Sequence, residues 1–151
     1  MEAALKAFET WRKVKAQIRS DVLFKAAAIL RKRKYEFSAL MTKEAGKPWP
    51  EADADTAEAI DFLEYYGRQM LELTESDKKT LSRRNLERNE FRYTPLGVAA
   101  VITPWNHPFG MFAWGVFPNL IAGNPVVFKI SEECPLIGKL IEEIMLNHEL
   151  P

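Results

Sequence analysis

The chain has 151 residues, of which 47% are hydrophobic and 28% charged, a balance typical of globular proteins and not of disordered or fibrous ones. Its 21 basic and 21 acidic residues cancel, so neither nucleic acid nor an anionic membrane is favoured as a partner. The single cysteine excludes an internal disulfide framework, and the first residues include acidic side chains and lack the apolar run of a signal peptide. We therefore expect a cytoplasmic protein.

The first half of the chain has the periodicity of amphipathic helices. Apolar residues at helical spacing predict one helix over about residues 2–19 and a second that Ser20 caps and that ends before Gly46. A third helix is predicted to open after Pro50. This half is therefore expected to be mainly helical.

Two charged clusters lie on these helices. The basic run Arg31–Lys34 could contact phosphates, but it has no interleaved aromatic residue, so a solvated helix face is favoured. Acidic residues open the third helix, where they could suggest a metal site: Glu51, Asp53, Asp55 and Glu58. Because no histidine is near them in the sequence, we interpret them as complementing the helix dipole and expect no metal site.

A change in composition marks the main internal boundary. After a polar segment over about residues 75–84 and an alternating, strand-like segment over 87–93, the stretch from Tyr93 to Phe128 contains no Asp, Glu, Lys or Arg. A membrane span is one interpretation, but prolines and glycines interrupt every window long enough to cross a bilayer. We therefore divide the chain at residues 1–92 and 93–151, and expect strands and a helix buried on all sides in the second part.

The second part alternates strand and helix signals. Short apolar runs predict strands over 97–102 and 125–130, and helices are predicted over 108–122 and 134–147. This order predicts an α/β fold in which a βαβ unit begins a doubly wound, Rossmann-like sheet. Ligands are then expected at the carboxyl ends of the strands.

Two residues at these strand ends have both a structural and a functional interpretation. Asn106 could cap the following helix, or its side-chain amide could donate a hydrogen bond to an oxyanion. Lys129 could be a lysine extending to solvent at the sheet edge, or it could donate to a ribose hydroxyl. A Gly-x-Gly-x-x-Gly fingerprint is absent from the sequence.

Other candidates for chemistry are weaker. Cys134 precedes a proline and follows Glu132 and Glu133, charges that would raise the pKa of its thiol, so a nucleophilic role is disfavoured. His107 is interpreted as part of a turn in preference to a base, and His148 as a surface residue.

The segment Tyr93-Thr-Pro-Leu-Gly-Val-Ala-Ala-Val-Ile-Thr-Pro-Trp-Asn106, followed by Gly123-Asn-Pro-Val-Val-Phe-Lys-Ile-Ser-Glu132, resembles the first βαβ unit of the aldehyde dehydrogenase superfamily. Upstream, Lys43-Glu-Ala-Gly-Lys-Pro-Trp49 and the segment from Glu51 to Tyr66 resemble the N-terminal part of the bacterial 1-pyrroline-5-carboxylate dehydrogenase branch. The resemblance implies an oxyanion donor at Asn106, an adenosine-ribose contact at Lys129 with Glu132 beside it, and NAD as cofactor. It also implies that the backbone of four residues lines the cofactor cleft: Ile102, Thr103, Pro104 and Trp105.

The implied reaction is attack of a cysteine thiolate on glutamate γ-semialdehyde, hydride transfer to NAD⁺ and hydrolysis of the thioester to glutamate, by a homo-oligomeric enzyme. The family's nucleophilic cysteine and general-base glutamate lie beyond the matching region, so we expect this chain alone to be inactive. Two positions depart from the family pattern: Ile130 replaces a proline, and His107 replaces a frequent phenylalanine. Alternatives are a dehydrogenase for another aldehyde, or a truncated, non-catalytic module that binds NAD or oligomerises.

Overall fold

The structure is a computed structural model that describes residues 1–76, 83–84, 87–88 and 92–147. Six helices and four short strands lie in these ranges, in the order α1 (Glu2–Trp11), α2 (Ala16–Lys32), α3 (Lys34–Ala45), α4 (Trp49–Ser76), β1 (Arg83–Arg84), β2 (Glu87–Arg88), β3 (Ala99–Ile102), α5 (Pro108–Ile121), β4 (Val126–Lys129) and α6 (Pro135–Asn147). No helix within them combines the length and the hydrophobicity needed to cross a bilayer.

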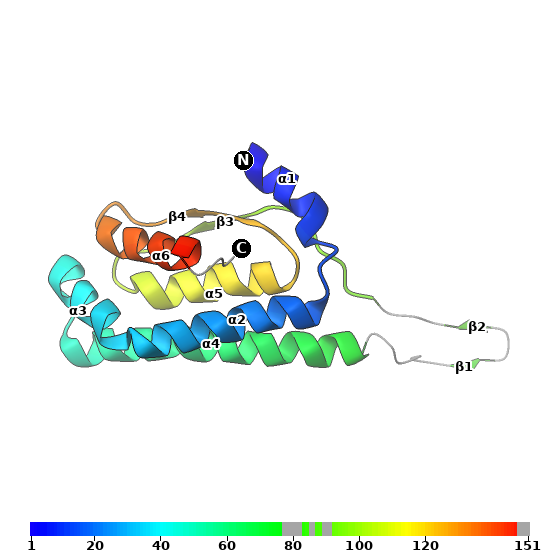
Figure 1. Cartoon of the computed structure of the whole chain (residues 1–151), viewed down its shortest axis with the longest axis horizontal. Helices are drawn as coiled ribbons and strands as arrows, with labels where there is room; N and C mark the ends of the chain where they lie inside the picture. Colours follow the sequence, from blue (N-terminus) through cyan, green and yellow to red (C-terminus); the bar gives the residue numbers. More distant parts are fainter. Residues whose placement is uncertain (77–82, 85–86, 89–91, 148–151) are drawn as a thin grey trace.

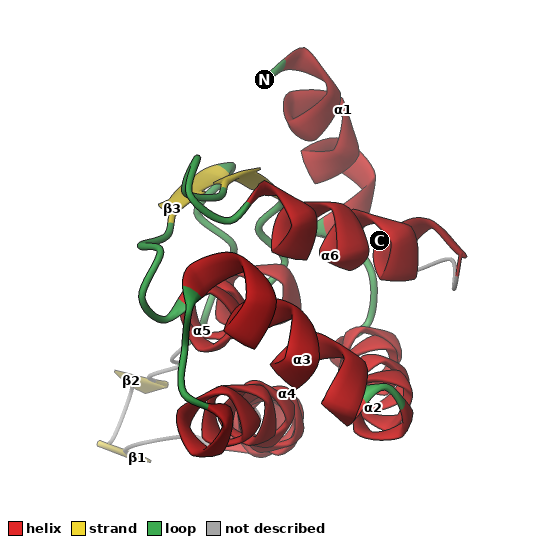
Figure 2. Cartoon of the chain, turned by 90° about the vertical axis from the view of Figure 1, so that its left-hand side faces the viewer, coloured by secondary structure: helices red, strands yellow, loops and turns green. Residues whose placement is uncertain are grey.

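The predicted βαβ unit is confirmed. Strands β3 and β4 pair in parallel, with Ala99 opposite Val126 and Ile102 opposite Lys129, and α5 makes the crossover between them. Helices α5 and α6 lie on the same side of the sheet (Figures 1 and 2). A Cβ at Gly115 would lie only 2.6 Å from the Val101 side chain, so the glycine allows α5 to approach β3 closely.

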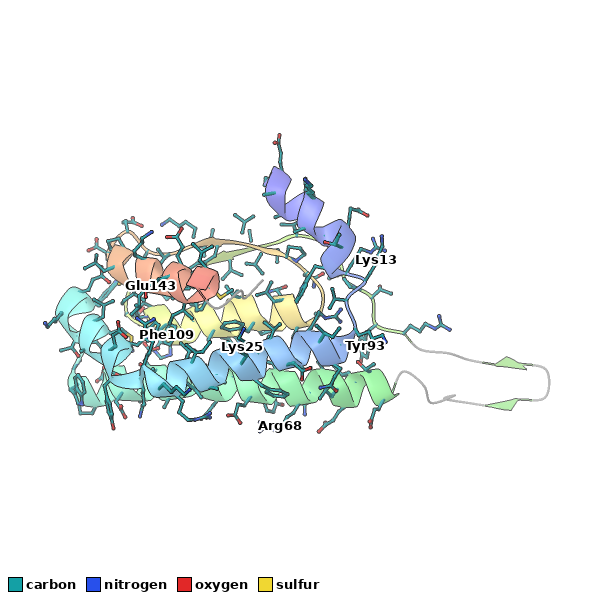
Figure 3. All side chains as sticks on the ribbon, viewed as in Figure 1. Lys13, Lys25, Arg68, Tyr93, Phe109 and Glu143 are labelled. Carbon is teal, nitrogen blue, oxygen red and sulfur yellow. The ribbon has the colours of Figure 1, made fainter. Side chains whose placement is uncertain are left out.

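The helical half of the chain packs on the other side of α5. Helices α2 and α4 run side by side along its length, and α3 crosses at one end, next to α6 (Figures 1 and 2). Phe109 near the start of α5 is 1% exposed and stacks on Phe37 of α3 at a centroid distance of 4.3 Å. Figure 3 shows Phe109 at the end of α5 nearest α3. One continuous apolar core therefore joins the helical segment to the βαβ unit.

The expectation that the strands are buried on all sides was wrong. Ala99, Val101, Val126 and Phe128 face the core, whereas Ala100, Ile102, Val127 and Lys129 alternate with them and are exposed. Ile102 is 76% exposed and Val127 is 37% exposed. The strands have apolar residues on both faces, with Lys129 at the end of the outer one, but the described helices α5 and α6 cover only the inner face.

Two helix boundaries also differ from the prediction. The first expected helix ends at Trp11, and a new helix, α2, runs through Ser20. The Ser20 hydroxyl does not cap a helix, because it donates to the carbonyl of Gly67 in α4 over 3.0 Å. A further break at Arg33 separates α2 from α3, and neither break has a glycine or proline to mark it.

The break after α1 brings two donors to the end of α5. The Trp11 indole donates to the Leu120 carbonyl over 2.8 Å, and the Arg19 guanidinium donates to the Ile121 carbonyl over 2.7 Å. These carbonyls are among the last four of the helix, which have no partner within it. Burial lowers the pKa of Arg19 from its ordinary value, but the guanidinium stays charged and complements the negative end of the α5 dipole.

Candidate active site

The candidate site lies at the carboxyl edge of the parallel pair. The backbone N–H of Thr103 donates to the carbonyl of Lys129 over 3.2 Å, so the two strands end side by side. The turn from Thr103 to His107 and the turn from Ile130 to Cys134 therefore begin at one edge of the sheet, as expected for a ligand site in an α/β fold.

Asn106 does not cap the following helix, and that interpretation was wrong. The N-cap residue of α5 is His107, and its side chain makes no capping hydrogen bond. The Asn106 side chain is exposed and has no hydrogen-bond partner within the described part of the chain. Its amide is therefore uncommitted, as an oxyanion donor requires before substrate binds.

Four residues precede Asn106 and were expected to line a cofactor cleft: Ile102, Thr103, Pro104 and Trp105. Three of them are exposed: Ile102, Pro104 and Trp105. Thr103 is only 6% exposed, and its buried hydroxyl has no hydrogen-bond partner in the part of the chain that the structure describes. The Trp105 carbonyl accepts a hydrogen bond from the Cys134 thiol at 3.5 Å, which ties the two turns together.

Lys129 and Glu132 form an ion pair on the second turn. The ammonium lies 2.7 Å from the carboxylate, and both side chains are exposed. The hydrogen bond from Lys129 is the main cause that lowers the pKa of Glu132. The turn between them has no proline, and Ile130 instead packs against Gly138 of α6, where a Cβ would lie 3.0 Å from the isoleucine. The pair offers both a donor and an acceptor to solvent.

Cys134 is a poor nucleophile, as expected, but mainly for another reason. Its pKa is raised chiefly by burial, and then by the charges of Glu44 and Glu133. Glu44 comes from α3 and is a contact that the local sequence could not predict. Since the thiolate is the nucleophilic form, burial and these charges disfavour a nucleophilic role for Cys134.

A partly buried polar cluster beside the Asn106 turn was missed by the sequence analysis. Asp55 of α4 has a fully buried side chain and pairs with Lys47, whose ammonium lies 2.7 Å away. Lys47 also contacts Nδ1 of His107 at 3.0 Å, and Nε2 of His107 contacts Glu58 at 2.6 Å. Nδ1 of His107 also lies 3.2 Å from Oδ2 of Asp55, so the imidazole contacts the ammonium of Lys47 and both carboxylates of the cluster.

This cluster borders a cavity of about 400 Å³ that six residues line: Lys47, Glu51, Ala54, Asp55, Glu58 and His107. The acidic residues of α4 are therefore not only complements to a helix dipole. His107, distant from them in sequence, lies against Asp55 and Glu58. Across the described ranges, no set of three or more His, Cys, Asp or Glu side chains is arranged for a metal ion.

The basic run is also engaged in ion pairs. Arg33 pairs with Glu36 at 2.6 Å and with Glu143 of α6 at 3.3 Å, and Lys34 pairs with Asp53 at 2.8 Å. Arg31 pairs with Glu64. The run therefore serves contacts between helices, which agrees with its interpretation as a helix face.

Comparison with known proteins finds relatives that are similar in sequence and in structure. The chain is 51% identical over 151 residues to a 1-pyrroline-5-carboxylate dehydrogenase of Bacillus thuringiensis, covering 100% of this chain and 29% of the relative. A 1-pyrroline-5-carboxylate dehydrogenase from Thermus, solved with bound NAD, is 43% identical with a TM-score of 0.88, covering 95% of this chain and 28% of that one. Proline utilization A from Bdellovibrio bacteriovorus is 36% identical with a TM-score of 0.88, covering 97% of this chain and 15% of that one.

The chain thus spans less than a third of the length of the curated relatives that it matches, 29% in the example above. The structural agreement extends over both the helical segment and the parallel pair, so the fold is that of the N-terminal portion of these enzymes. The sequence pattern of the aldehyde dehydrogenase family matches residues 1–151. The chain therefore belongs to the aldehyde dehydrogenase family, a family of oxidoreductases.

Proposed function

We propose that this chain forms the N-terminal, cofactor-side part of an NAD-dependent aldehyde dehydrogenase that oxidises glutamate γ-semialdehyde (1-pyrroline-5-carboxylate) to glutamate in proline catabolism. The observation that carries the proposal is the uncommitted, exposed amide of Asn106 on the turn that follows β3. That turn shares a sheet edge with the Lys129–Glu132 pair. The 51% identity to a 1-pyrroline-5-carboxylate dehydrogenase supports this choice of aldehyde.

The chemistry of this edge fits NAD as the cofactor. Lys129 supplies a donor and Glu132 an acceptor for the two hydroxyls of a ribose, and both are exposed. The exposed backbone from Ile102 to Trp105 lies at the same edge, and the buried Thr103 hydroxyl is a polar group without a partner in the described ranges. When bound, NAD⁺ would accept the hydride that the aldehyde carbon loses.

Within this proposal, Asn106 stabilises negative charge. Attack on an aldehyde places that charge on the carbonyl oxygen, and a fixed amide donor near that oxygen lowers the barrier. We place the attacking cysteine and the general-base glutamate outside residues 1–151. Cys134 is unsuited to the first role, because it is buried and its raised pKa keeps the thiol protonated.

The proposal extends to the organisation of the complete enzyme. We assign residues 1–92 to the N-terminal helices and the start of the oligomerisation strands, and residues 93–151 to the first part of a Rossmann-like NAD-binding domain. We propose a homo-oligomer, because the antiparallel pair β1–β2 projects from the end of the helical layer (Figure 1). Paired strands that leave a domain in this way present edges for pairing with another subunit.

The test uses a chimera in which residues 1–151 replace the matching 29% of the Bacillus thuringiensis dehydrogenase. We expect NAD reduction with glutamate γ-semialdehyde and a fall in kcat of about 10²–10³ on Asn106→Ala. Lys129→Ala should raise the KM for NAD more than it lowers kcat. Asn119→Ala is the matched control, because among the described residues that side chain bonds only the Gly115 carbonyl within α5, at 2.8 Å.

Four outcomes would contradict the proposal. A chimera without dehydrogenase activity, or equal kcat values for the Asn106 and Asn119 variants, would remove the catalytic assignment. A higher kcat/KM with a simple aliphatic aldehyde would reassign the substrate. NAD reduction by the 151-residue chain alone would show that the missing groups were wrongly placed.

A further inference from the structure

The first turn of α5 receives its cap from another helix. The first N–H groups of a helix lack partners within it, and a side chain just before the helix usually supplies an acceptor. Here the N-cap residue His107 supplies none. Instead, Oδ1 of Asp55 in α4 accepts the backbone N–H of Gly110, the third residue of α5.

Asp55 is itself held in a fixed position. Its side chain is fully buried, and its second oxygen, Oδ2, pairs with Lys47 at 2.7 Å. Lys47 is only 9% exposed and also contacts Nδ1 of His107 at 3.0 Å. The Asp55 carboxylate therefore connects α4 to Lys47, in the segment between α3 and α4. It also contacts His107 and Gly110 at the start of α5.

The positions of the His107 ring and the Glu58 carboxylate depend on the glycine. A Cβ at Gly110 would overlap the His107 ring and come within 2.9 Å of the Glu58 carboxylate. The absence of a side chain at Gly110 leaves the space that this ring and carboxylate occupy beside α5. Asn106 immediately precedes this braced segment, and its own side chain is not used for capping.

We infer that Asp55 is a positioning residue for Asn106: by capping α5 at Gly110, it fixes the turn while leaving the Asn106 amide free to donate to substrate. The inference rests on the proposed function of Asn106. If Asp55 did not supply this acceptor, the Gly110 N–H would lose its partner, and a shift of the turn that brings the Asn106 side chain to it would take the amide away from the substrate. Asp55 touches no reacting atom, so it acts only through the turn.

The test compares two double variants that both remove the buried charges. In Lys47→Met with Asp55→Asn, the amide oxygen can still accept the Gly110 N–H. In Lys47→Met with Asp55→Leu, the side chain has a similar size and no acceptor. The difference between them isolates the capping bond from the cost of leaving a buried charge unpaired.

In the chimera, we expect kcat of the asparagine form to stay within about threefold of the parent, and kcat of the leucine form to fall by about 10- to 100-fold. The KM for NAD should change by less than about twofold in both, because only the donor to substrate is displaced. Ser20→Ala is the control for general destabilisation. It removes the buried bond to Gly67, far along α4 from Asp55.

A second readout on the 151-residue chain does not depend on activity. Hydrogen exchange at the Gly110 amide should be at least about tenfold faster in the leucine form than in the asparagine form. Equal exchange rates, or equal kcat in the two active chimeras, would overturn the role of Asp55. An inactive parent chimera with the expected difference in exchange would overturn the proposed function and leave the capping bond established.

Discussion

Glu44 should stabilise the protein by capping α6 from a distance. Its carboxylate accepts the N–H of Leu136 over 2.6 Å and the N–H of Ile137 over 2.9 Å, both in the first turn of α6. Replacing a capping residue with alanine costs about 0.5–2 kcal/mol, and a carboxylate at the positive end of a helix adds about 0.3–1 kcal/mol. Because the bond to Leu136 is exposed, we expect Glu44→Ala to lower the free energy of unfolding by about 1.5 kcal/mol.

Glu44→Gln should cost less, about 0.5 kcal/mol, because the amide oxygen still accepts while the charge is lost. Urea unfolding of the 151-residue chain, followed by tryptophan fluorescence, measures both values. The control is Glu142→Ala, which removes a surface pair with Lys139 on the same helix and should leave the unfolding midpoint unchanged. The reasoning fails if Glu44→Ala and Glu142→Ala have the same midpoint.

The same substitution has a second, independent consequence at Cys134. Glu44 is the second cause, after burial, that raises the pKa of the thiol. Glu44→Gln should therefore lower that pKa toward, but not to, its ordinary value, and thiol alkylation should begin at a lower pH than in the parent. Because the folded pKa is raised, the native state resists deprotonation, so Cys134 reduces stability as the pH rises past the ordinary thiol pKa. An unchanged pH profile of alkylation would mean that the carboxylate does not act on the thiol.

Phe109→Ala should destabilise the chain by about 3 kcal/mol or more, because a ring that is 1% exposed leaves a cavity against Phe37. Urea unfolding checks this against Tyr35→Ala, which removes a ring that is 70% exposed, and equal losses would show that α5 is not anchored by this stack. The 151-residue chain should also self-associate and bind a hydrophobic dye, because Ile102 and Val127 are exposed on the outer sheet face. A monodisperse monomer in light scattering, with no increase in the fluorescence of the dye, would contradict this.

Local sequence predicted the elements that depend on their own composition. The strands Ala99–Ile102 and Val126–Lys129 and the helix Pro108–Ile121 lie within two residues of their expected bounds. Each combines a short apolar run with proline or glycine at its ends, so the signal is contained in the segment itself. The breaks after Trp11 and at Arg33 had no such signal in the sequence. Residues on either side of the first break, Trp11 and Arg19, make long-range contacts with α5 that the local sequence does not reveal.

The polar cluster at the candidate site could not be predicted for the same reason. Asp55 and Gly110 are 55 positions apart, and Lys47 and His107 are 60 apart, so no local pattern pairs them. The resemblance to a known family made Asn106, Lys129 and Glu132 candidates, since those residues lie in contiguous motifs. One hint of this cluster lay in the sequence: the first turns of α4 contain more carboxylates than are needed to complement a helix dipole.

The trans caps explain why both strand-end turns remain open. Asp55 of α4 caps α5, and Glu44 of α3 caps α6, while Trp11 and Arg19 satisfy carbonyls at the far end of α5. Each turn is thus relieved of a task that usually falls to its own side chains. The helical half of the chain therefore does more than pack against α5 and α6: it supplies acceptors that the βαβ unit lacks. Residues 93–151 without it would leave the Gly110, Leu136 and Ile137 N–H groups to water or to side chains of their own turns.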